Sequence, residues 1–340
     1  MTWASERPGV YSDYDASGVL WGQAAGKSVG IAAAGQGEPG AVYTVSRVSD
    51  AVFLFGEGSS LSSLCAAALA NGAASVAAVP VESSAPDYAA AFAALEEKKV
   101  CAVLCDSTSP SVHASLMDSV KKASSRKKER VGLAVYQGED PLSWADSFSC
   151  ERMVLLAQQP DSGAACGFAA AFAGRIAQAS NPSVPLHGNV LSGFSGISPA
   201  LSESQIDDYV QAGICPLEYV DGGVEIIRAV TSRVSQEDGT PDRTFQELST
   251  VLTMDQVMVS LRNSLEALLQ GARNNARTQA SLATQAGVLL QTHQAAGLID
   301  SYQRPRAYAD EDDPSVCIVE VSFVISRGMN QIRVAAHIQV

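Results

Sequence analysis

The chain has 340 residues, of which 46% are hydrophobic and 17% charged, and its net charge at pH 7 is −13. This composition excludes a disordered chain, because it supplies enough apolar side chains for one large core or two ordinary domains. The acidic balance argues against non-specific nucleic-acid binding, which needs clustered Lys and Arg. The one basic run, KKASSRKKER at 121–130, is interpreted as the solvated end of a helix.

Targeting and metal-binding signals are missing from the sequence. The segment MTWASERPGVY has no apolar run typical of a secretory signal, and no apolar stretch is long enough for a membrane span. Of the seven cysteines, Cys101 and Cys105 lie in a strand-like run, without a second pair at zinc-site spacing. We therefore expect reduced, structural thiols in a protein made in the cytoplasm, with no metal and no membrane insertion.

Residues 27–185 alternate short apolar runs with alanine-rich runs, which is typical of an α/β domain with a mainly parallel sheet. The expected strands are KSVGIAAA (27–34), AVYTVSRV (41–48), ASVAAVPV (74–81), VCAVLCDS (100–107), RVGLAVYQ (130–137) and RMVLLAQQ (152–159). The expected helices are LSSLCAAALANG (61–72), PDYAAAFAALEEKK (86–99), SVHASLMDSVKKASS (111–125), PLSWADSF (141–148) and GAACGFAAAFAGRIAQ (163–178).

The character of the sequence changes after this region, and residues 186–313 predict a smaller α+β domain. SESQIDDYVQAG (202–213) predicts a short helix with a capping box formed by Ser202 and Gln205. CPLEYVDGGVEIIRAVTS (215–232) predicts a hairpin, since its Asp-Gly-Gly turn favours positive φ.

Two further helices are expected in the same domain. TMDQVMVSLRNSLEALLQGA (253–272) has a helical apolar stripe and a capping box at Thr253 and Gln256, and another helix is expected over about 280–298. The acidic segment YADEDDPS (308–315) is interpreted as a linker, which ends the domain.

Both ends of the chain are β-prone. The N-terminal segment 1–26 is interpreted as an extended arm, and residues 314–340 as a terminal hairpin or arm with the β-runs CIVEVSFVIS and QIRVAAHIQV. In the second run, apolar residues alternate with mostly polar ones, as in a strand with one buried face. An unpaired strand at a chain end is an aggregation hazard, so we expect neighbouring copies to exchange these strands.

Two glycine motifs raise a nucleotide-binding alternative. GQAAGKS (22–28) is one residue short of a Walker A loop, and its serine opens a strand rather than a helix. GQGEPG (35–40) has dinucleotide-fold spacing, but another strand is expected after it, which leaves no helix N-terminus for a pyrophosphate. The four histidines are scattered. We expect no cofactor and no catalytic residues, and keep an α/β nucleotide- or flavin-binding enzyme with an oligomerising tail as the alternative.

The order of several segments resembles the sheath proteins of contractile phage tails and related injection systems. These segments are RPGVY, SVGIAAAGQGEPGAVYTVSRVSDAVFLFG, LANGAASVAAVPV, YVDGGVEIIRAVTS, DQVMVSLRNSLEALL, AGLID and the two terminal β-runs. The resemblance spans nearly the whole chain, although the chain is short for the family. It implies a non-enzymatic structural subunit of a phage tail or tail-like bacteriocin, assembled in the bacterial cytoplasm and released as part of a particle.

The resemblance also implies partners. Copies would stack as rings, hexameric in the family's pattern, around an inner tail tube, with baseplate and tail terminator proteins at the ends. Contraction would drive the tube through a target envelope. The residues expected to take part in strand exchange between subunits are Val10, Tyr11, Ile318, Val321, Phe323, Ile332, Val334, Ile338 and Val340. The expected contacts with an acidic tube are Arg262, Arg273 and Arg277.

Overall fold

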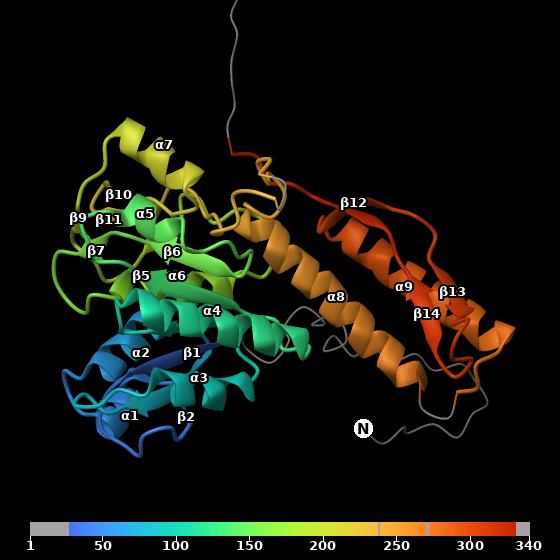
Figure 1. The fold of residues 1–340 in the computed structure, drawn as a ribbon, viewed down its shortest axis with the longest axis horizontal. Coiled ribbons are helices and arrows are strands. Elements are labelled where there is room, and N and C mark those ends of the chain that lie inside the picture. Colours follow the sequence, from blue (N-terminus) through green and yellow to red (C-terminus); the bar gives the residue numbers. More distant parts are fainter. Residues whose placement is uncertain (1–26, 237–238, 270–271, 331–340) are drawn as a thin grey trace, which may run out of the picture.

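The computed structural model describes residues 27–236, 239–269 and 272–330 of the chain. Figure 1 shows a rounded α/β body followed by an elongated arm, which consists of two long helices and a narrow β-ribbon. Segments 1–26 and 331–340, which the sequence analysis assigns to terminal arms, lie outside the described residues. The residues that the structure describes include no helix long and apolar enough to cross a membrane.

A six-stranded sheet with the order β2-β3-β1-β4-β5-β6 forms the centre of the body. All neighbouring pairs are parallel except β2–β3, so the prediction of a mainly parallel sheet is confirmed. The strands are β1 (Ser28–Ala34), β2 (Tyr43–Val45), β3 (Ser75–Val81), β4 (Ala102–Cys105), β5 (Val131–Val135) and β6 (Met153–Leu156).

Helices cover both faces of this sheet because its strands alternate apolar side chains between two cores. On β1, Ile31 packs into one hydrophobic cluster and Ala32 into the other. The first cluster includes residues from α1 (Val48–Phe55), α2 (Ser60–Ala70) and α6 (Gly167–Gln178). The second includes residues from α3 (Tyr88–Glu96), α4 (Pro110–Ser125) and α5 (Pro141–Ala145).

The first core continues past the domain boundary that the sequence analysis places at residue 186. Leu217, Ile226 and Leu248 belong to the same buried cluster as β1. The elements in this part are β7 (Gln159–Pro160), β8 (Val190–Leu191), β9 (Ile197–Ser198), α7 (Glu203–Gln211), β10 (Leu217–Val220) and β11 (Gly223–Ile226). The capping box at Ser202 and the β10–β11 hairpin are confirmed.

The arm starts on α8 (Leu248–Leu269) and returns on α9 (Ala276–Ala295). Its strands are β12 (Ile299–Tyr302), β13 (Arg306–Ala309), β14 (Cys317–Glu320) and β15 (Phe323–Ile325). β12 pairs with β15 and β13 with β14, both antiparallel. Residues 299–309 and 317–325 therefore form one two-stranded ribbon, which contacts α9 along its length.

Four predicted elements differ from the structure. Only Tyr43–Val45 of the expected strand at 41–48 is extended, and helix α1 follows, since Ala51 and Phe55 are buried against the sheet. Helix α8 begins at Leu248, so the capping box expected at Thr253 is wrong. Leu248 and Val251 are fully buried, and this packing extends the helix by more than a turn beyond the expected start.

The acidic segment is the turn of a hairpin and not a free linker, because β13 and β14 pair on either side of it. The boundary expected at residue 313 lies within this turn. The β-run at 317–326 is also divided, since β14 and β15 pair with different strands on either side of a break at Val321 and Ser322.

Candidate assembly interface

The ribbon buries one face against the arm helices and exposes the other. Val319, Val321 and Phe323 pack against a small core that includes Val257 and Leu290. On the outer face, the Val324 side chain is 55% exposed and that of Tyr308 is 44% exposed. Exposed apolar side chains on a narrow sheet form a surface that another chain can cover.

Both long edges of the ribbon are open within the part of the chain that the structure describes. Each of its strands pairs with one other strand only. An open edge presents backbone N–H and C=O groups that can accept an added strand. Two-stranded ribbons are also marginal on their own, which favours further strands.

The structure places the described members of the predicted strand-exchange set in this ribbon. Ile318 lies on β14 opposite Tyr308, and is half-buried. Val321 and Phe323 instead contribute to the core of the subunit itself. The other members lie outside the described residues: Val10, Tyr11, Ile332, Val334, Ile338 and Val340.

The three arginines predicted to contact a tube lie in two different environments. Arg262 lies on α8 and forms an ion pair with Glu129 of the body. Arg273 and Arg277 are exposed at the α8–α9 junction. There, Asn274 donates hydrogen bonds to the Pro314 and Val316 carbonyls, which fixes the junction to the ribbon turn.

Two ion pairs hold the first half of α8 on the body. The Arg152 guanidinium donates to both carboxylate oxygens of Asp255, each at 2.7 Å, and the second pair is Arg262 with Glu129. Asp255 and Arg262 are seven residues apart, about two helical turns, so they lie on one face of α8. The bidentate pair is nearly buried, with the two side chains 11% and 14% exposed. The sequence gives no signal for it, because its partners are 103 residues apart.

The nucleotide-binding alternative is best tested at the carboxyl ends of β1 and β4. The parallel strands follow the order 2-1-3-4-5 along the chain, in which ligands bind at this position. Here the Asp106 carboxylate accepts hydrogen bonds from the Ala34 N–H (2.9 Å) and the Tyr88 hydroxyl (2.7 Å). Burial and the Asp106 carboxylate raise the pKa of Tyr88. A fixed carboxylate in this position repels a phosphate.

The described residues of the two glycine motifs, 27–28 and 35–40, include no helix N-terminus that could hold a phosphate. Ser28 begins β1, as expected, and Lys27 donates to the Ala179 carbonyl at 2.5 Å. No helix begins at Gly40, because the next helix is α1 at Val48. Gly37 has φ +119°, and a Cβ there would lie 2.9 Å from the Pro80 side chain, so the glycine serves a tight turn.

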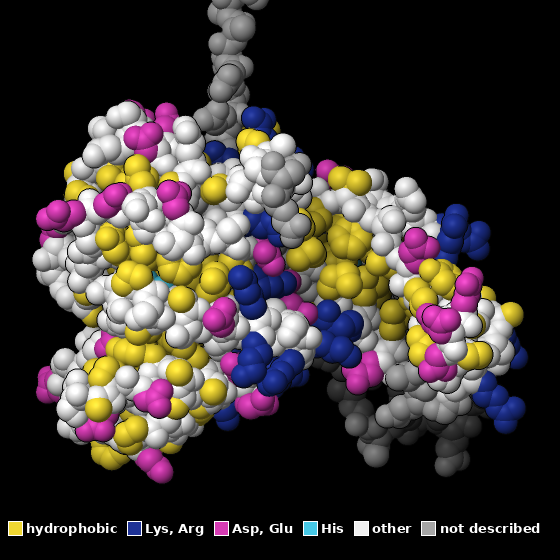
Figure 2. Space-filling view, viewed as in Figure 1, with side chains coloured by type: hydrophobic (Ala, Val, Ile, Leu, Met, Phe, Trp, Pro, Cys, Tyr) yellow, Lys and Arg dark blue, Asp and Glu magenta, His cyan; other side chains and the backbone are white. Residues whose placement is uncertain are grey.

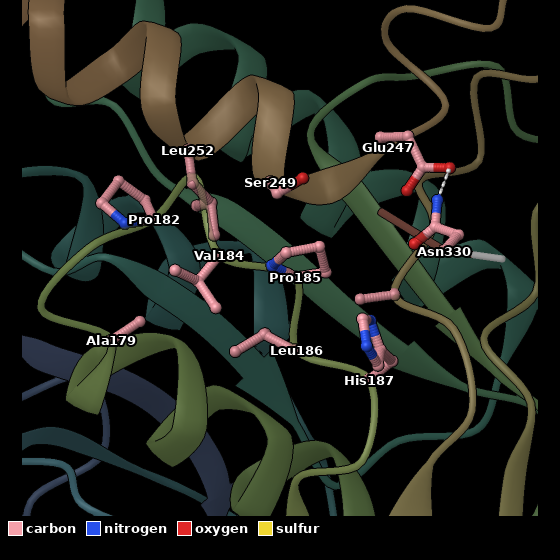
Figure 3. Close-up of a pocket in the computed structure, with 11 residues that line it drawn as sticks. Ala179, Pro182, Val184, Pro185, Leu186, His187, Glu247, Ser249, Leu252 and Asn330 are labelled. Carbon is pink, nitrogen blue, oxygen red and sulfur yellow. Dashed lines mark hydrogen bonds between the residues drawn. The ribbon is translucent and has the colours of Figure 1, made fainter. Parts of the chain in front are cut away.

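A hollow at the base of the arm is lined mainly by apolar side chains, including Val184, Pro185, Leu186 and Leu252 (Figure 3). Its carboxylate, Glu247, accepts hydrogen bonds from Arg228 and Asn330. Among the described residues, no group of three or more Cys, His, Asp or Glu could hold a metal ion. Burial raises the pKa of the Cys105 and Cys215 thiols to about 12, which makes them poor nucleophiles at neutral pH.

Comparison with known proteins identifies the central part of the body. The family model "Phage tail sheath protein central domain" matches residues 82–232. This part of the chain is similar to the central domain of phage tail sheath proteins. The matched segment runs from α3 to the end of the β10–β11 region, so it holds strands β4, β5 and β6 of the sheet, helices α3 to α7 and the hairpin. Among curated proteins, none matches the chain significantly.

Solved sheath proteins share the fold beyond this central domain. The sheath tail protein of Desulfitobacterium hafniense is 13% identical, with a TM-score of 0.69 over 93% of this chain and 100% of the other. A chain of the anti-feeding prophage helical sheath in the contracted state is 16% identical, with a TM-score of 0.72 over 99% and 98%. A chain of that particle's contracted baseplate is 16% identical, with a TM-score of 0.74 over 100% and 98%.

Proposed function

We propose that the protein is a structural subunit of a contractile tail sheath. Copies polymerise around an inner tube, and contraction of the polymer drives the tube through a target envelope. The observation that carries the proposal is the match to the sheath central domain together with a fold shared over 99% of the chain with a contracted helical sheath. The sheath belongs to a phage tail or a tail-like particle that the bacterial cell assembles and releases.

The partners follow from this role. Other copies of the chain bind laterally and along the polymer, and the structural match to a sheath chain in a baseplate supports a baseplate contact. An inner tube protein and a tail terminator complete the set. For the tube contact, Arg273 and Arg277 remain candidates because they are exposed, whereas Arg262 is engaged with Glu129.

The open ribbon explains how a lattice can move without coming apart. Strands from the terminal segments of neighbouring copies add to its edges, and main-chain pairing does not depend on how the bodies are oriented. Each added backbone hydrogen bond contributes about 1 kcal/mol net. Several such bonds per strand, repeated over every subunit, hold the polymer while the bodies change their contacts.

The test is deletion of residues 1–19, with a matched control in which a Gly/Ser segment of equal length replaces them. The two variants should keep the circular dichroism spectrum of the body and lose long tubes in electron micrographs. The Gly/Ser control separates the loss of specific apolar side chains from the loss of chain length. Tubes of wild-type length in both variants would exclude the N-terminal segment as a connector.

A further inference from the structure

Cations gather where helices α3 and α4 end on the body, and all of them except the half-buried Lys128 are exposed. The basic patch consists of Lys98, Lys99, Lys121, Lys122, Arg126, Lys127 and Lys128. Figure 2 shows dark blue side chains together in this region, which faces the arm. In a chain with net charge −13, such a concentration of cations is unusual.

Neighbouring acids neutralise only part of the patch. Lys122 and Arg126 share the Glu96 carboxylate, at 2.9 and 3.7 Å, and Lys128 pairs with Glu97 at 2.7 Å. Each helix end adds a charge equivalent to roughly −0.5. Two carboxylates and two helix ends contribute about three negative charges, and the exposed Asp118, one turn before Lys121 and Lys122 on α4, contributes a fourth. Against the seven positive charges this leaves an excess of about three. Lys98, Lys99, Lys121 and Lys127 form no ion pair with any described residue.

Local structure does not require the excess cations. Arg130, which is buried, donates to the Leu95 and Lys98 carbonyls, both at 2.7 Å, and so caps the end of α3. Lys127 lies at the end of α4 with φ +64°, where glycine is the favoured residue. A lysine in this conformation is strained by about 1 kcal/mol, so its charge is retained against the local preference.

The complementary surface is on the same chain. The acidic turn, defined as Asp310 to Asp313, joins β13 to β14. The Asp310 carboxylate accepts hydrogen bonds from the Asp312 and Asp313 N–H groups, which orders the turn. Glu311 and Asp312 are exposed and form no ion pair with any described residue.

The two charged surfaces lie on different parts of the molecule. The acidic turn is at the α8–α9 end of the ribbon, since Asn274 binds the carbonyls beside it, and the patch is on the body. Figure 1 shows the turn at the end of the arm remote from the body. A contact between unlike surfaces of identical chains repeats from copy to copy and generates a closed ring or an open helical polymer.

We propose that the basic patch of one copy binds the acidic turn of a neighbouring copy. The proposal rests on the proposed sheath function, because it assigns one of the contacts in the polymer. Three exposed carboxylates on an ordered turn, Glu311, Asp312 and Asp313, match the excess of about three positive charges. The interaction is electrostatic and weakens as salt rises, whereas strand exchange through the ribbon depends on backbone hydrogen bonds.

The experiment reverses charges in the basic patch, in the acidic turn, and then in both surfaces together. One variant carries Lys121→Glu and Lys127→Glu, another Glu311→Lys and Asp312→Lys, and a third carries all four changes. Each one-sided variant should raise the critical concentration for tube assembly at least tenfold, and the fourfold variant should recover most of that loss. The control, Asp207→Lys with Asp208→Lys on α7, makes the same charge change as the turn variant at an exposed site elsewhere and should leave assembly unchanged.

A fourfold variant that assembles no better than the one-sided variants would overturn the proposal. Loss of assembly on reversal of the patch alone, with no effect from the turn, would assign the patch to another anionic partner and also overturn it. Lys127→Gly is the second variant: it should raise the melting temperature while weakening assembly. If the wild-type chain forms no tubes, the proposed function fails, and the same charge-swap pattern in self-association measured by sedimentation would still support the contact.

Discussion

The body and the arm both contain amphipathic helices, but they differ in how many layers cover each apolar side chain. In the body, a sheet lies between two helical layers, and Leu104 on β4 is fully buried. In the arm, two helices and a ribbon enclose a small core that is centred on Val257, Leu261 and Leu290. The arm therefore leaves one face of its ribbon exposed, whereas the sheet of the body is covered on both faces.

The largest expected effect is a loss of local stability on truncating either of two fully buried leucines, one in the body and one in the arm. Leu104→Ala in the body and Leu290→Ala in the arm should each cost about 2–5 kcal/mol of local stability. Because the arm core is small and separate, Leu290→Ala should raise hydrogen exchange only in residues 257–325, whereas Leu104→Ala should raise it throughout the body. Uniform exchange in both variants would show that body and arm unfold as a single unit.

The second prediction is a loss of stability in acid, with one histidine in each region. Burial lowers the pKa of His113 in the body and of His293 in the arm. Below about pH 6.5 the unfolded chain binds protons that the folded chain does not, so stability is present above this pH and is lost as the pH falls. The loss is at most about 1.4 kcal/mol per pH unit for each histidine.

His113→Gln and His293→Gln separate the two contributions. Urea unfolding at pH 7, 6 and 5 should show a flatter pH dependence of the body in the first variant. Hydrogen exchange should show the same for the arm in the second, where His293 is hydrogen-bonded to Ser260 at 2.6 Å. An unchanged pH slope in a variant would assign the acid sensitivity of that region to carboxylates.

The smallest expected effect is a gain of stability in the arm. Gly287 lies in the middle of α9, and a Cβ there would have its nearest neighbour, the Pro305 side chain, at 3.7 Å. Gly287→Ala should therefore stabilise the helix by about 0.5–1 kcal/mol. Ala283→Gly, one turn earlier, is the matched reverse change. Slower exchange in α9 for the first and faster exchange for the second would confirm the prediction, and no change in either would contradict it.

The sequence by itself determined the elements whose signals are local. Parallel-sheet strands are continuously apolar, so β3, β4, β5 and β6 could be predicted from composition alone. The hairpin at Asp221 and Gly222, which have φ of 49° and 88°, was predictable because few residues adopt this conformation. The absence of a helix at Gly40 likewise followed from the residues beside it.

Only the tertiary structure decided where the long-range contacts lie. Helix α8 extends back to Leu248 because that residue packs in the body core. Arg262 is paired with Glu129, 133 residues away, so its ion-pair partner could not be predicted from the neighbouring sequence. The acidic segment forms a turn because β13 and β14 pair across it, and its composition suits a turn or a linker equally well. Hydrophobic periodicity can be recognised within one segment. Strand pairing depends on two segments, so it is known only when the positions of both in the fold are known.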